Sequence, residues 1–353
     1  MTRQESIYIA GPEVFFNNGD EVLKAMRILA ESRGHSVTLP NDDPLEMNHT
    51  DRRLNAQSIF KNLLKVMNNT SLIIADLDQF RGSEPDSGTI FELGMAYARK
   101  IRTYGFARDT RPLAWKDQKI VKKDSELLDE NGKVHHYSFL PFSPLVMAST
   151  QIVEGNFEQA LIQTELDAYR IREEIELPKK DKSKLNKPTI FVALRDYYDS
   201  ESVKKAQESL RKQNNSAFDF EFPYFRNLTD GESINSWLEE LLFENTKRIN
   251  KAEVFVADLN NFRGDECSND VGFLSGYAFT QGKSMFGYMN DTRPMIKKIP
   301  NTKKCGKFKD IAERDVENFD YPINLMFGLK SIFETDFKRH SEPRLPSTAQ
   351  INH

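Results

Sequence analysis

Two carboxylates, Asp86 and Glu92, stand close together in the segment ADLDQFRGSEPDSGTIFELG, which spans residues 75–94. Residues 71–77 form a short apolar run of strand length, and residues 90–96 have the apolar spacing of a helix. In open parallel sheets, such strand–loop–helix connections lie at the carboxyl ends of the strands, where ligands bind. Carboxylates placed there can stabilise a positively charged transition state, and one of them can act as a nucleophile.

Each of these residues also has a plainer interpretation. Thr89 and Glu92 have the spacing of a capping box, in which Thr89 caps the helix and Glu92 bonds back to its amide. Asp86 has the type and position of an ordinary turn residue before a helix. Tyr8, in the apolar strand expected at 6–10, fits a core aromatic whose hydroxyl is satisfied. Taken singly, these residues leave structural and chemical roles open.

The combination of motifs favours the chemical role. FRGSEPDSGTIFELGMAYA, together with YIAGP at residues 8–12, resembles the signature of the nucleoside 2-deoxyribosyltransferases over most of residues 6–112. The resemblance implies that Glu92 is the nucleophile that forms a covalent glycosyl-enzyme. Asp86 then either binds sugar hydroxyls or takes part in proton handling, and the sequence does not separate these roles. Tyr8 can donate a hydrogen bond to Glu92 and hold its rotamer.

The resemblance also implies residues that contact the substrate. Gly11 and Pro12 end the first strand in a turn, and Gly88 lies between the two carboxylates. Asp42 lies where the family places part of its base-binding loop, although ordinary polarity of an exposed loop explains it equally well. Asn62 resembles a family polar position on the preceding helix that faces the base.

Composition sets the broad class of this protein. The 353 residues, 39% hydrophobic and 29% charged, suffice for two globular domains. A net charge of −4 gives no case for nucleic-acid binding, and no apolar run approaches the roughly 18 residues of a membrane span. Cys267 and Cys305 form no metal or redox motif, so we expect neither a metal nor a cofactor. Since no secretory leader is visible, a cytoplasmic location is the simplest expectation.

Strand and helix patterns alternate along the chain, which predicts an α/β fold. We expect flavodoxin- or Rossmann-like domains, each a doubly wound parallel sheet of about five strands. In the first half, strands are expected at 6–10, 36–40, 71–77 and 103–106. Residues 151–174 have the pattern of one long helix. Residues 113–140 are charged and irregular, which fits a surface loop better than a lid, and His135 and His136 are expected to face solvent there.

The pattern begins again after the lysine-rich segment PKKDKSKLNKP. With a shift of 182, residues 76–112 align without gaps on residues 258–294, and 14 of the 37 positions are identical. The chain is therefore interpreted as a tandem duplication of one domain. We expect a catalytic domain at 1–177, a linker at 178–188, a degenerate second domain at 189–340 and a tail at 341–353.

The second copy lacks the reactive side chains of the first. The replacements are Asp86 by Ser268, Gly88 by Asp270, Thr89 by Val271 and Glu92 by Leu274. A leucine can act neither as a nucleophile nor as a base, so the second copy should be catalytically silent on its own. Arg81 and Arg263 occur at the same position of both copies, and we expect them to serve the loop or an interface.

A segment near the end of the second copy, Tyr321-Pro-Ile-Asn-Leu-Met326, resembles a family segment that completes the active site of a neighbouring subunit. We align it with residues 142–147 of the first copy, where Leu145 replaces the amide. The resemblance therefore predicts a pseudo-dimer within one chain, whose single site is completed by Asn324 and Met326. The alternative is that this segment is only a strand start and a core methionine.

Three functions remain open at this stage. The resemblance favours transfer of a 2-deoxyribosyl group between nucleobases in nucleotide salvage, with deoxyribonucleosides and free nucleobases as substrates. Relatives of this fold hydrolyse nucleoside monophosphates, but no basic or Ser-rich cluster for a phosphate is evident near Gly11. A non-catalytic nucleoside-binding protein is the third possibility, against which the intact Asp86 and Glu92 argue. The family commonly forms trimers of dimers, so a homo-oligomer, for example a trimer of pseudo-dimers, is expected.

Overall fold

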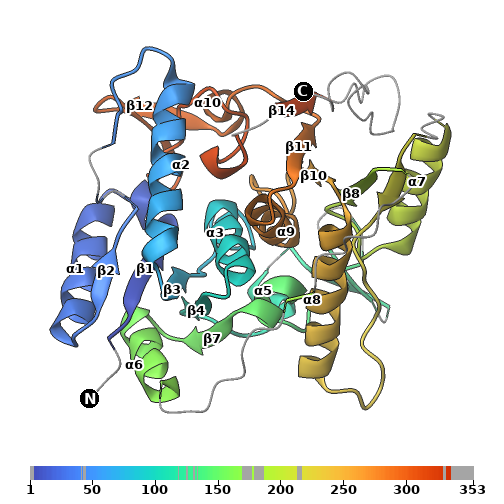
Figure 1. The fold of residues 1–353 in the computed structure, drawn as a ribbon, viewed down its shortest axis with the longest axis horizontal. Coiled ribbons are helices and arrows are strands. Elements are labelled where there is room, and N and C mark those ends of the chain that lie inside the picture. Colours follow the sequence, from blue (N-terminus) through green and yellow to red (C-terminus); the bar gives the residue numbers. More distant parts are fainter. Residues whose placement is uncertain are drawn as a thin grey trace.

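Two α/β units with equivalent strand orders form the chain in the computed structural model (Figure 1). The structure describes residues 4–40, 42, 45–117, 119–124, 126–129, 132, 134–168, 177–178, 187–212, 217–328 and 331–334. The first parallel sheet has the order β2-β1-β3-β4-β7, and the second has the equivalent order β9-β8-β10-β11-β14. Both orders reverse beside the first strand, as in doubly wound sheets. The expected α/β class, with five strands in each sheet, is confirmed.

The central strands are apolar runs buried between helix layers. The first sheet contains β1 (Ser6–Ala10), β2 (Ser36–Thr38), β3 (Leu72–Asp76), β4 (Arg102–Ala107) and β7 (Gln151–Glu154). The second contains β8 (Thr189–Ala193), β9 (Asp219–Glu221), β10 (Val254–Asp258), β11 (Ser284–Met289) and β14 (Ser331–Glu334). All residues of β3, β8 and β10 are buried, which fits parallel strands covered on both faces.

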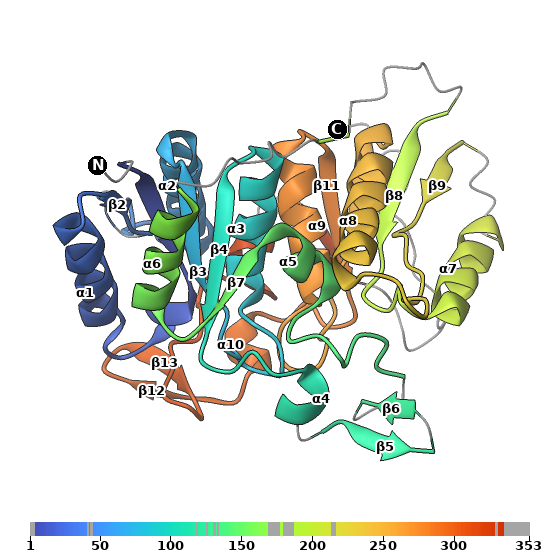
Figure 2. The same cartoon turned by 90° about the horizontal axis from the view of Figure 1, so that it is seen from below.

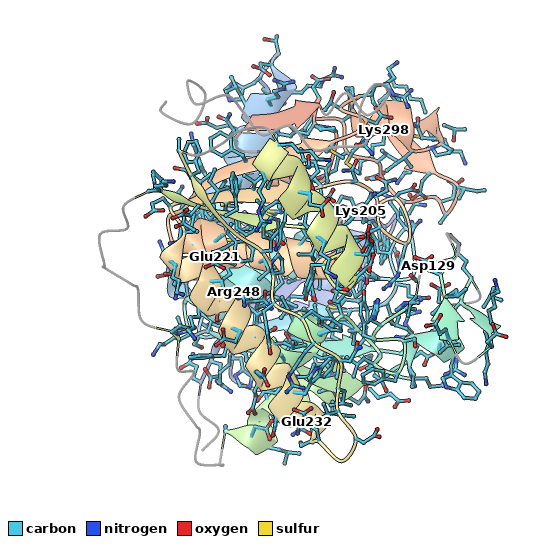
Figure 3. All side chains as sticks on the ribbon, turned by 90° about the vertical axis from the view of Figure 1, so that its right-hand side faces the viewer. Asp129, Lys205, Glu221, Glu232, Arg248 and Lys298 are labelled. Atoms are coloured by element: carbon cyan, nitrogen blue, oxygen red, sulfur yellow. The ribbon has the colours of Figure 1, made fainter. Side chains whose placement is uncertain are left out.

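The helices lie on both faces of each sheet. The longer ones are α1 (Gly19–Ser32), α2 (Arg52–Asn69), α3 (Ser87–Ala98), α6 (Phe157–Asp167), α7 (Ser200–Lys212), α8 (Ile234–Lys251) and α9 (Asn269–Thr280). The short ones are η1 (Pro12–Phe15), α4 (Leu113–Lys116), α5 (Pro144–Ser149), α10 (Met295–Lys298) and η2 (Leu325–Phe327). The outer helices are amphipathic: α7 buries Ala206 and Leu210, while Lys205 lies on the outer face seen in Figure 3.

Helices α3 and α9 pack side by side at the centre of the molecule and join the two units (Figure 1). Both are buried around nearly their whole circumference, because each faces its own sheet and the other helix. Two glycines permit this approach. A Cβ on Gly94 would lie 2.0 Å from the carbonyl oxygen of Phe273, and one on Gly276 would lie 1.9 Å from that of Phe91. These pairs correspond under the shift of 182, so the helices meet about a pseudo-twofold axis.

The Phe-Arg-Gly turns that precede these helices meet on the same axis, where their glycines form an antiparallel β-bridge. Arg81 and Arg263 both have left-handed backbone conformations, with φ angles of 51° and 53°. Each arginine faces a glutamate of the other unit, since Arg81 lies 3.6 Å from Glu266 and Arg263 lies 3.6 Å from Glu84. Of the two predicted roles, the loop or an interface, these contacts support the interface.

Residues 151–174 do not form one long helix, so that expectation is wrong. Gln151–Glu154 pair with β4 as the edge strand β7, and Gly155 then turns the chain with a positive φ of 127°. Helix α6 begins only at Phe157, because Asn156 caps it in a capping box with Gln159. Local sequence pattern did not reveal the strand, which is short and only partly buried.

Residues 113–140 are not a plain surface loop. They contain α4 and a hairpin of β5 (Val121–Lys123) and β6 (Glu126–Leu128), which lies below the second unit in Figure 2. The equivalent hairpin of the second unit, β12 (Asn301–Lys304) and β13 (Lys307–Asp310), lies below the first unit. Each unit therefore sends one hairpin towards its neighbour.

The position of the first hairpin also corrects the expectation that His135 and His136 face solvent. His135 is 3% exposed and packs edge-on against Tyr137, with ring centroids 4.9 Å apart. His136 is half-buried and contacts Phe225 of the second unit. They do not face solvent, because the chain after the hairpin returns to the interface between the units.

Some sequence predictions fall outside the described part of the chain. Of the predicted linker 178–188, the structure describes only residues 178, 187 and 188, and the predicted tail 341–353 lies wholly outside it. The proposed domain boundaries therefore stay predictions. None of the helices in the described ranges is long and apolar enough to span a membrane.

Candidate active site

A cavity of about 460 Å³ lies between the two units, at the carboxyl ends of the strands of the first sheet. The first unit lines it with Gly11, Val14, Phe15, Pro40, Leu45, Met47, Ile59, Asp86, Gly88, Thr89 and Glu92. The second unit lines it with Gly306, Lys307, Phe308, Asp315, Val316, Glu317, Asn318, Phe319, Asn324, Leu325 and Met326. The volume is in the range of small-molecule pockets, and the lining combines apolar walls with a few carboxyl groups.

Asp86 is the N-cap of α3. Its Oδ2 accepts hydrogen bonds from the Thr89 amide at 2.7 Å and the Thr89 hydroxyl at 2.8 Å. The capping-box interpretation of Thr89 and Glu92 is therefore wrong, because the helix begins three residues earlier than that pattern requires. Burial raises the pKa of Asp86, although the hydrogen bonds from Thr89 oppose this effect.

Glu92 lies on the first turns of α3 and is held by a tyrosine from β1. The Tyr8 hydroxyl donates a hydrogen bond of 2.9 Å to Oε1 of Glu92, and both side chains are buried. Burial raises the pKa of Glu92 to about 8; the Tyr8 hydroxyl opposes this shift and the nearby Asp86 carboxylate adds to it. Glu92 thus enters the cavity as a fixed and poorly solvated carboxyl group.

Asn324 of the second unit contacts this acidic group directly. Its Nδ2 donates to Oδ1 of Asp86 at 3.4 Å, and its Oδ1 accepts from the Met326 amide at 3.0 Å, which caps η2. A Cβ on Gly88 would lie 2.5 Å from Nδ2 of Asn324. Glycine at position 88 therefore makes room for the amide that the other unit supplies.

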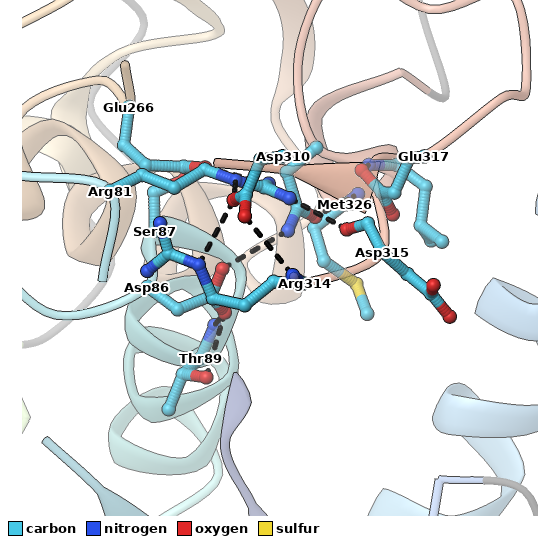
Figure 4. A network of polar contacts seen from close by, with 12 residues as sticks. Arg81, Asp86, Ser87, Thr89, Glu266, Asp310, Arg314, Asp315, Glu317 and Met326 are labelled. Carbon is cyan, nitrogen blue, oxygen red and sulfur yellow. Dashed lines mark hydrogen bonds and ion pairs between the residues drawn. The ribbon is translucent and has the colours of Figure 1, made fainter. Parts of the chain in front are cut away.

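A network of ion pairs and hydrogen bonds lies beside Asp86 (Figure 4). Arg81 donates to Asp310 at 3.2 Å and to the carbonyl oxygen of Asp315 at 2.6 Å. Asp310 also binds Arg314 at 2.9 Å. The network ties the Phe-Arg-Gly turn of the first unit to the hairpin of the second, and so fixes the cavity wall.

The corresponding region of the second unit is filled with side chains. Asp270, the residue aligned with Gly88, accepts hydrogen bonds from the hydroxyls of Tyr197 at 2.7 Å and Tyr198 at 2.6 Å. It also accepts from the Leu145 amide at 3.1 Å, and Leu274 beside it is fully buried. Tyr197 and Tyr198 continue into a cluster of aromatic rings. The expectation of a silent second copy is consistent with this packing.

The structure changes the register between the two copies near Asn324. Met295 donates to the carbonyl oxygen of Tyr321 at 2.9 Å, and Leu113 donates equivalently to Leu140 at 2.8 Å. Pro322 therefore corresponds to Pro141, and Asn324 corresponds to Ser143, the N-cap of α5. The alignment of Asn324 with Leu145 was two residues out of register. The first copy still lacks the amide.

A family model described as nucleoside 2-deoxyribosyltransferase matches residues 7–161 and again residues 190–326. The chain belongs to the nucleoside 2-deoxyribosyltransferase family. The two matched segments confirm the tandem duplication, and the chain is an enzyme of this transferase family. No curated protein matches the sequence.

Several solved structures are similar to this deoxyribosyltransferase. A 2-desoxiribosyltransferase from Leishmania mexicana is 29% identical over 47% of this chain and 99% of its own, with a TM-score of 0.37. A 2-deoxyribosyltransferase from Bacillus psychrosaccharolyticus is 22% identical over 33% of this chain and 77% of its own, with a TM-score of 0.24. A conserved protein from Enterococcus faecalis V583 is 19% identical over 46% of this chain and 99% of its own, with a TM-score of 0.29.

The predicted site residues of this deoxyribosyltransferase fall into two groups. Those that line the cavity are Gly11, Asp86, Gly88, Glu92, Asn324 and Met326. Tyr8 lies behind Glu92, and Pro12 is the first residue of η1. Asp42 binds Arg27 and accepts from the Leu39 amide at 2.8 Å, and it is not among the lining residues.

Asn62 also lies outside the lining. It is buried and donates to the carbonyl oxygen of Pro40 at 3.4 Å, while its Oδ1 has no hydrogen-bond partner within the described residues. Asn245, an asparagine of the equivalent helix α8, is by contrast fully satisfied by Tyr224 and Leu241. Base contacts by Asp42 and Asn62 stay predictions.

Sequence reasoning missed the contribution of residues 306–319 to the cavity. Asp315 and Glu317 bring two further carboxyl groups, and Phe308 and Phe319 bring aromatic walls. No motif marks these residues, and their position follows only from the hairpin that crosses to the other unit. Among the described residues, no cluster of His, Cys, Asp or Glu side chains could hold a metal ion.

Proposed function

We propose that this chain transfers a 2-deoxyribosyl group between nucleobases by a retaining double displacement, with Glu92 as the nucleophile. The observation that carries the proposal is the 2.9 Å hydrogen bond from Tyr8 to Glu92 inside a cavity of nucleoside size. This bond leaves the second carboxyl oxygen of Glu92 available for attack on the anomeric carbon. Two displacements at that carbon retain its configuration.

The raised pKa of Glu92 fits this chemistry. Once Glu92 is ionised, its poorly solvated carboxylate gains most when positive charge develops beside it. The oxocarbenium-like transition state places that charge at the sugar ring. Asp86 is anchored by Thr89 through one oxygen and by Asn324 through the other, so it is positioned to bind a sugar hydroxyl.

The second unit completes the site in this proposal. Asn324 orients Asp86, and Met326 together with Phe308 and Phe319 forms apolar walls that exclude water. Exclusion of water favours transfer to a base over hydrolysis of the glycosyl-enzyme. The single chain therefore carries one complete site, built as a pseudo-dimer.

The charges around the cavity support nucleosides rather than nucleoside monophosphates as substrates. The acidic residues of the lining are Asp86, Glu92, Asp315 and Glu317. Lys307 is the cation among the described lining residues, and it is paired with Asp315 at 2.7 Å. A 5′-phosphate would meet more negative than positive charge here.

An exchange assay tests the proposal. Incubation with one deoxyribonucleoside and a different free base should yield the swapped nucleoside. Glu92→Ala should abolish the exchange, and a 2-fluoro sugar analogue should add its mass at Glu92. Release of free sugar without exchange, or activity confined to 5′-phosphates, would refute transfer between bases.

We also propose that the enzyme acts in nucleotide salvage in the cytoplasm as a homo-oligomer of these pseudo-dimers. Because one chain supplies both halves of the site, specific activity should not change on dilution, even where the oligomer dissociates. Analytical ultracentrifugation alongside the exchange assay tests this: activity that falls with dissociation would place part of the site at an intermolecular interface.

A further inference from the structure

The cavity contains a carboxyl group that the proposed mechanism leaves without a role. Glu317 belongs to the second unit and lines the cavity together with Asp86 and Glu92. Its Oε2 accepts a hydrogen bond of 3.2 Å from the Leu325 amide, the residue next to Asn324. One short turn therefore positions both the amide that contacts Asp86 and the Glu317 carboxyl.

We infer that Glu317 gives a proton to the departing nucleobase and takes one back from the incoming nucleobase. This inference rests on the proposed function. In Figure 4, Glu317 lies beside Met326 and on the other side of the network from Asp86. If the sugar is bound at Glu92 and Asp86, the attached base extends away from these two residues. The Glu317 carboxyl is then the one available to the base.

The surroundings of Glu317 favour its protonated form. Burial raises the pKa of Glu317 to about 8, and the carboxyl groups of Asp86 and Glu266 add to the shift. Arg81 acts in the opposite direction. A carboxylic acid that is neutral near pH 7 can donate a proton to a leaving group and, once ionised, can accept one.

The segment of the first unit that corresponds to Glu317 carries a histidine there and faces the filled region of the second unit. The main-chain bonds from Val316 to Phe308 and from His135 to Leu127, each 2.7 Å, set the correspondence between the copies. His136 is then the counterpart of Glu317. The carboxyl group therefore occurs only in the copy whose segment faces an open cavity.

Over the two half-reactions, Glu317 gives up one proton and regains one. In the first, a Glu92 carboxylate oxygen bonds to the anomeric carbon, and the electrons of the C–N bond pass to the base, which takes the Glu317 proton. In the second, the ionised Glu317 takes the N–H proton of the incoming base. The nitrogen of that base attacks the same carbon, and the ester to Glu92 breaks. Glu317 ends protonated and Glu92 ends as a carboxylate.

A leaving-group series on the full-length protein tests this role. Base release is measured in single turnovers with 2′-deoxyuridines whose 5-substituents make the departing uracil progressively more acidic. Glu317→Gln keeps an oxygen acceptor for the Leu325 amide but cannot supply a proton. It should slow release of unsubstituted uracil by roughly 10²- to 10⁴-fold and release of the most acidic uracils far less.

The control is Glu313→Gln, which removes an exposed carboxyl from the same segment that pairs with Lys304 outside the cavity. It should behave as wild type across the series. An equal slowing of all leaving groups by Glu317→Gln, or none, would overturn the proton-transfer role while leaving the proposed function intact. Wild-type protein that releases no base from any deoxyribonucleoside would overturn both.

Discussion

The side-chain amide of Asn324 lies 3.4 Å from the carboxylate of Asp86, although 238 residues separate them in the chain. The second unit thus contacts a carboxyl group in the cavity of the first unit, within the same polypeptide. The contact depends on Gly88, which leaves space for the amide, and on α3 and α9, whose glycines bring the two units together. The predictions below separate these contributions.

Asn324→Ser should reduce kcat/KM for base exchange by roughly 10- to 100-fold, the cost of one hydrogen bond to a charged group. Serine can still cap η2 through its hydroxyl, so the free energy of unfolding should change by less than about 1 kcal/mol. Serine is also what the first copy has at the corresponding position, Ser143. Exchange kinetics and urea unfolding on the same preparation check both expectations.

Asn324→Asp supplies the matched comparison, because it keeps the cap but sets a carboxylate against Asp86. Its loss of exchange should exceed that of the serine variant and should be relieved as the pH is lowered. Wild-type kinetics in both variants would remove the second unit from the catalytic site.

Leu274→Ala should affect stability and not chemistry. Leu274 is fully buried in α9 at the position of Glu92, and truncation of a buried leucine costs about 2–5 kcal/mol. Thermal unfolding should shift accordingly, while kcat per folded molecule stays at the wild-type value. A selective loss of kcat with unchanged unfolding would mean that the second copy has a catalytic role of its own.

Much of this architecture could be predicted from the sequence, because the relevant signals are local or repeated. The apolar runs of β1 and β3 and the shift of 182 between copies are visible without coordinates. The edge strand β7 was missed, since a four-residue strand that is only partly buried has no clear pattern. The helix start was also misplaced, because Asp86 and Thr89 are both good capping residues.

The lining of the candidate cavity was predicted only as far as its residues belong to motifs. Glu92 and Asp86 lie in a dense signature, and Asn324 lies in a recognisable segment. Glu317 belongs to no motif and reaches the cavity through a hairpin that crosses between units. Such a contribution depends on tertiary topology, which the spacing of residues along one chain does not encode.

Gly94→Ala and Gly276→Ala should destabilise the protein to a similar extent. In each variant the new methyl group would lie about 2 Å from a carbonyl oxygen of the opposite helix, so α3 and α9 must separate. Overpacking of this kind costs about 1–3 kcal/mol, measurable by urea unfolding. The control is Gly272→Ala, whose Cβ would lie 3.3 Å from its nearest neighbour, the Ser87 carbonyl oxygen. Equal effects in all three variants would contradict the close-approach explanation.

Glu92→Gln should stabilise the folded protein, and increasingly so as the pH rises. The pKa of Glu92 is raised from 4.5 to about 8 in the folded state, so folding retains a proton that the unfolded chain releases above pH 4.5. The stability associated with the neutral carboxyl is complete below pH 4.5 and is lost as the pH rises through about 8. The advantage of the glutamine variant should grow between these limits, by up to about 1.4 kcal/mol per pH unit, and then level off.

Urea unfolding of both proteins at pH 5, 7 and 9 measures this difference directly. Tyr8→Phe provides the complementary test, because it removes the hydroxyl whose hydrogen bond opposes the upward shift of the Glu92 pKa. In that variant the acid limb of the exchange pH profile should move to higher pH, since Glu92 must be ionised to attack. A stability difference between wild type and Glu92→Gln that is independent of pH would show that Glu92 is ionised in the folded enzyme throughout this range.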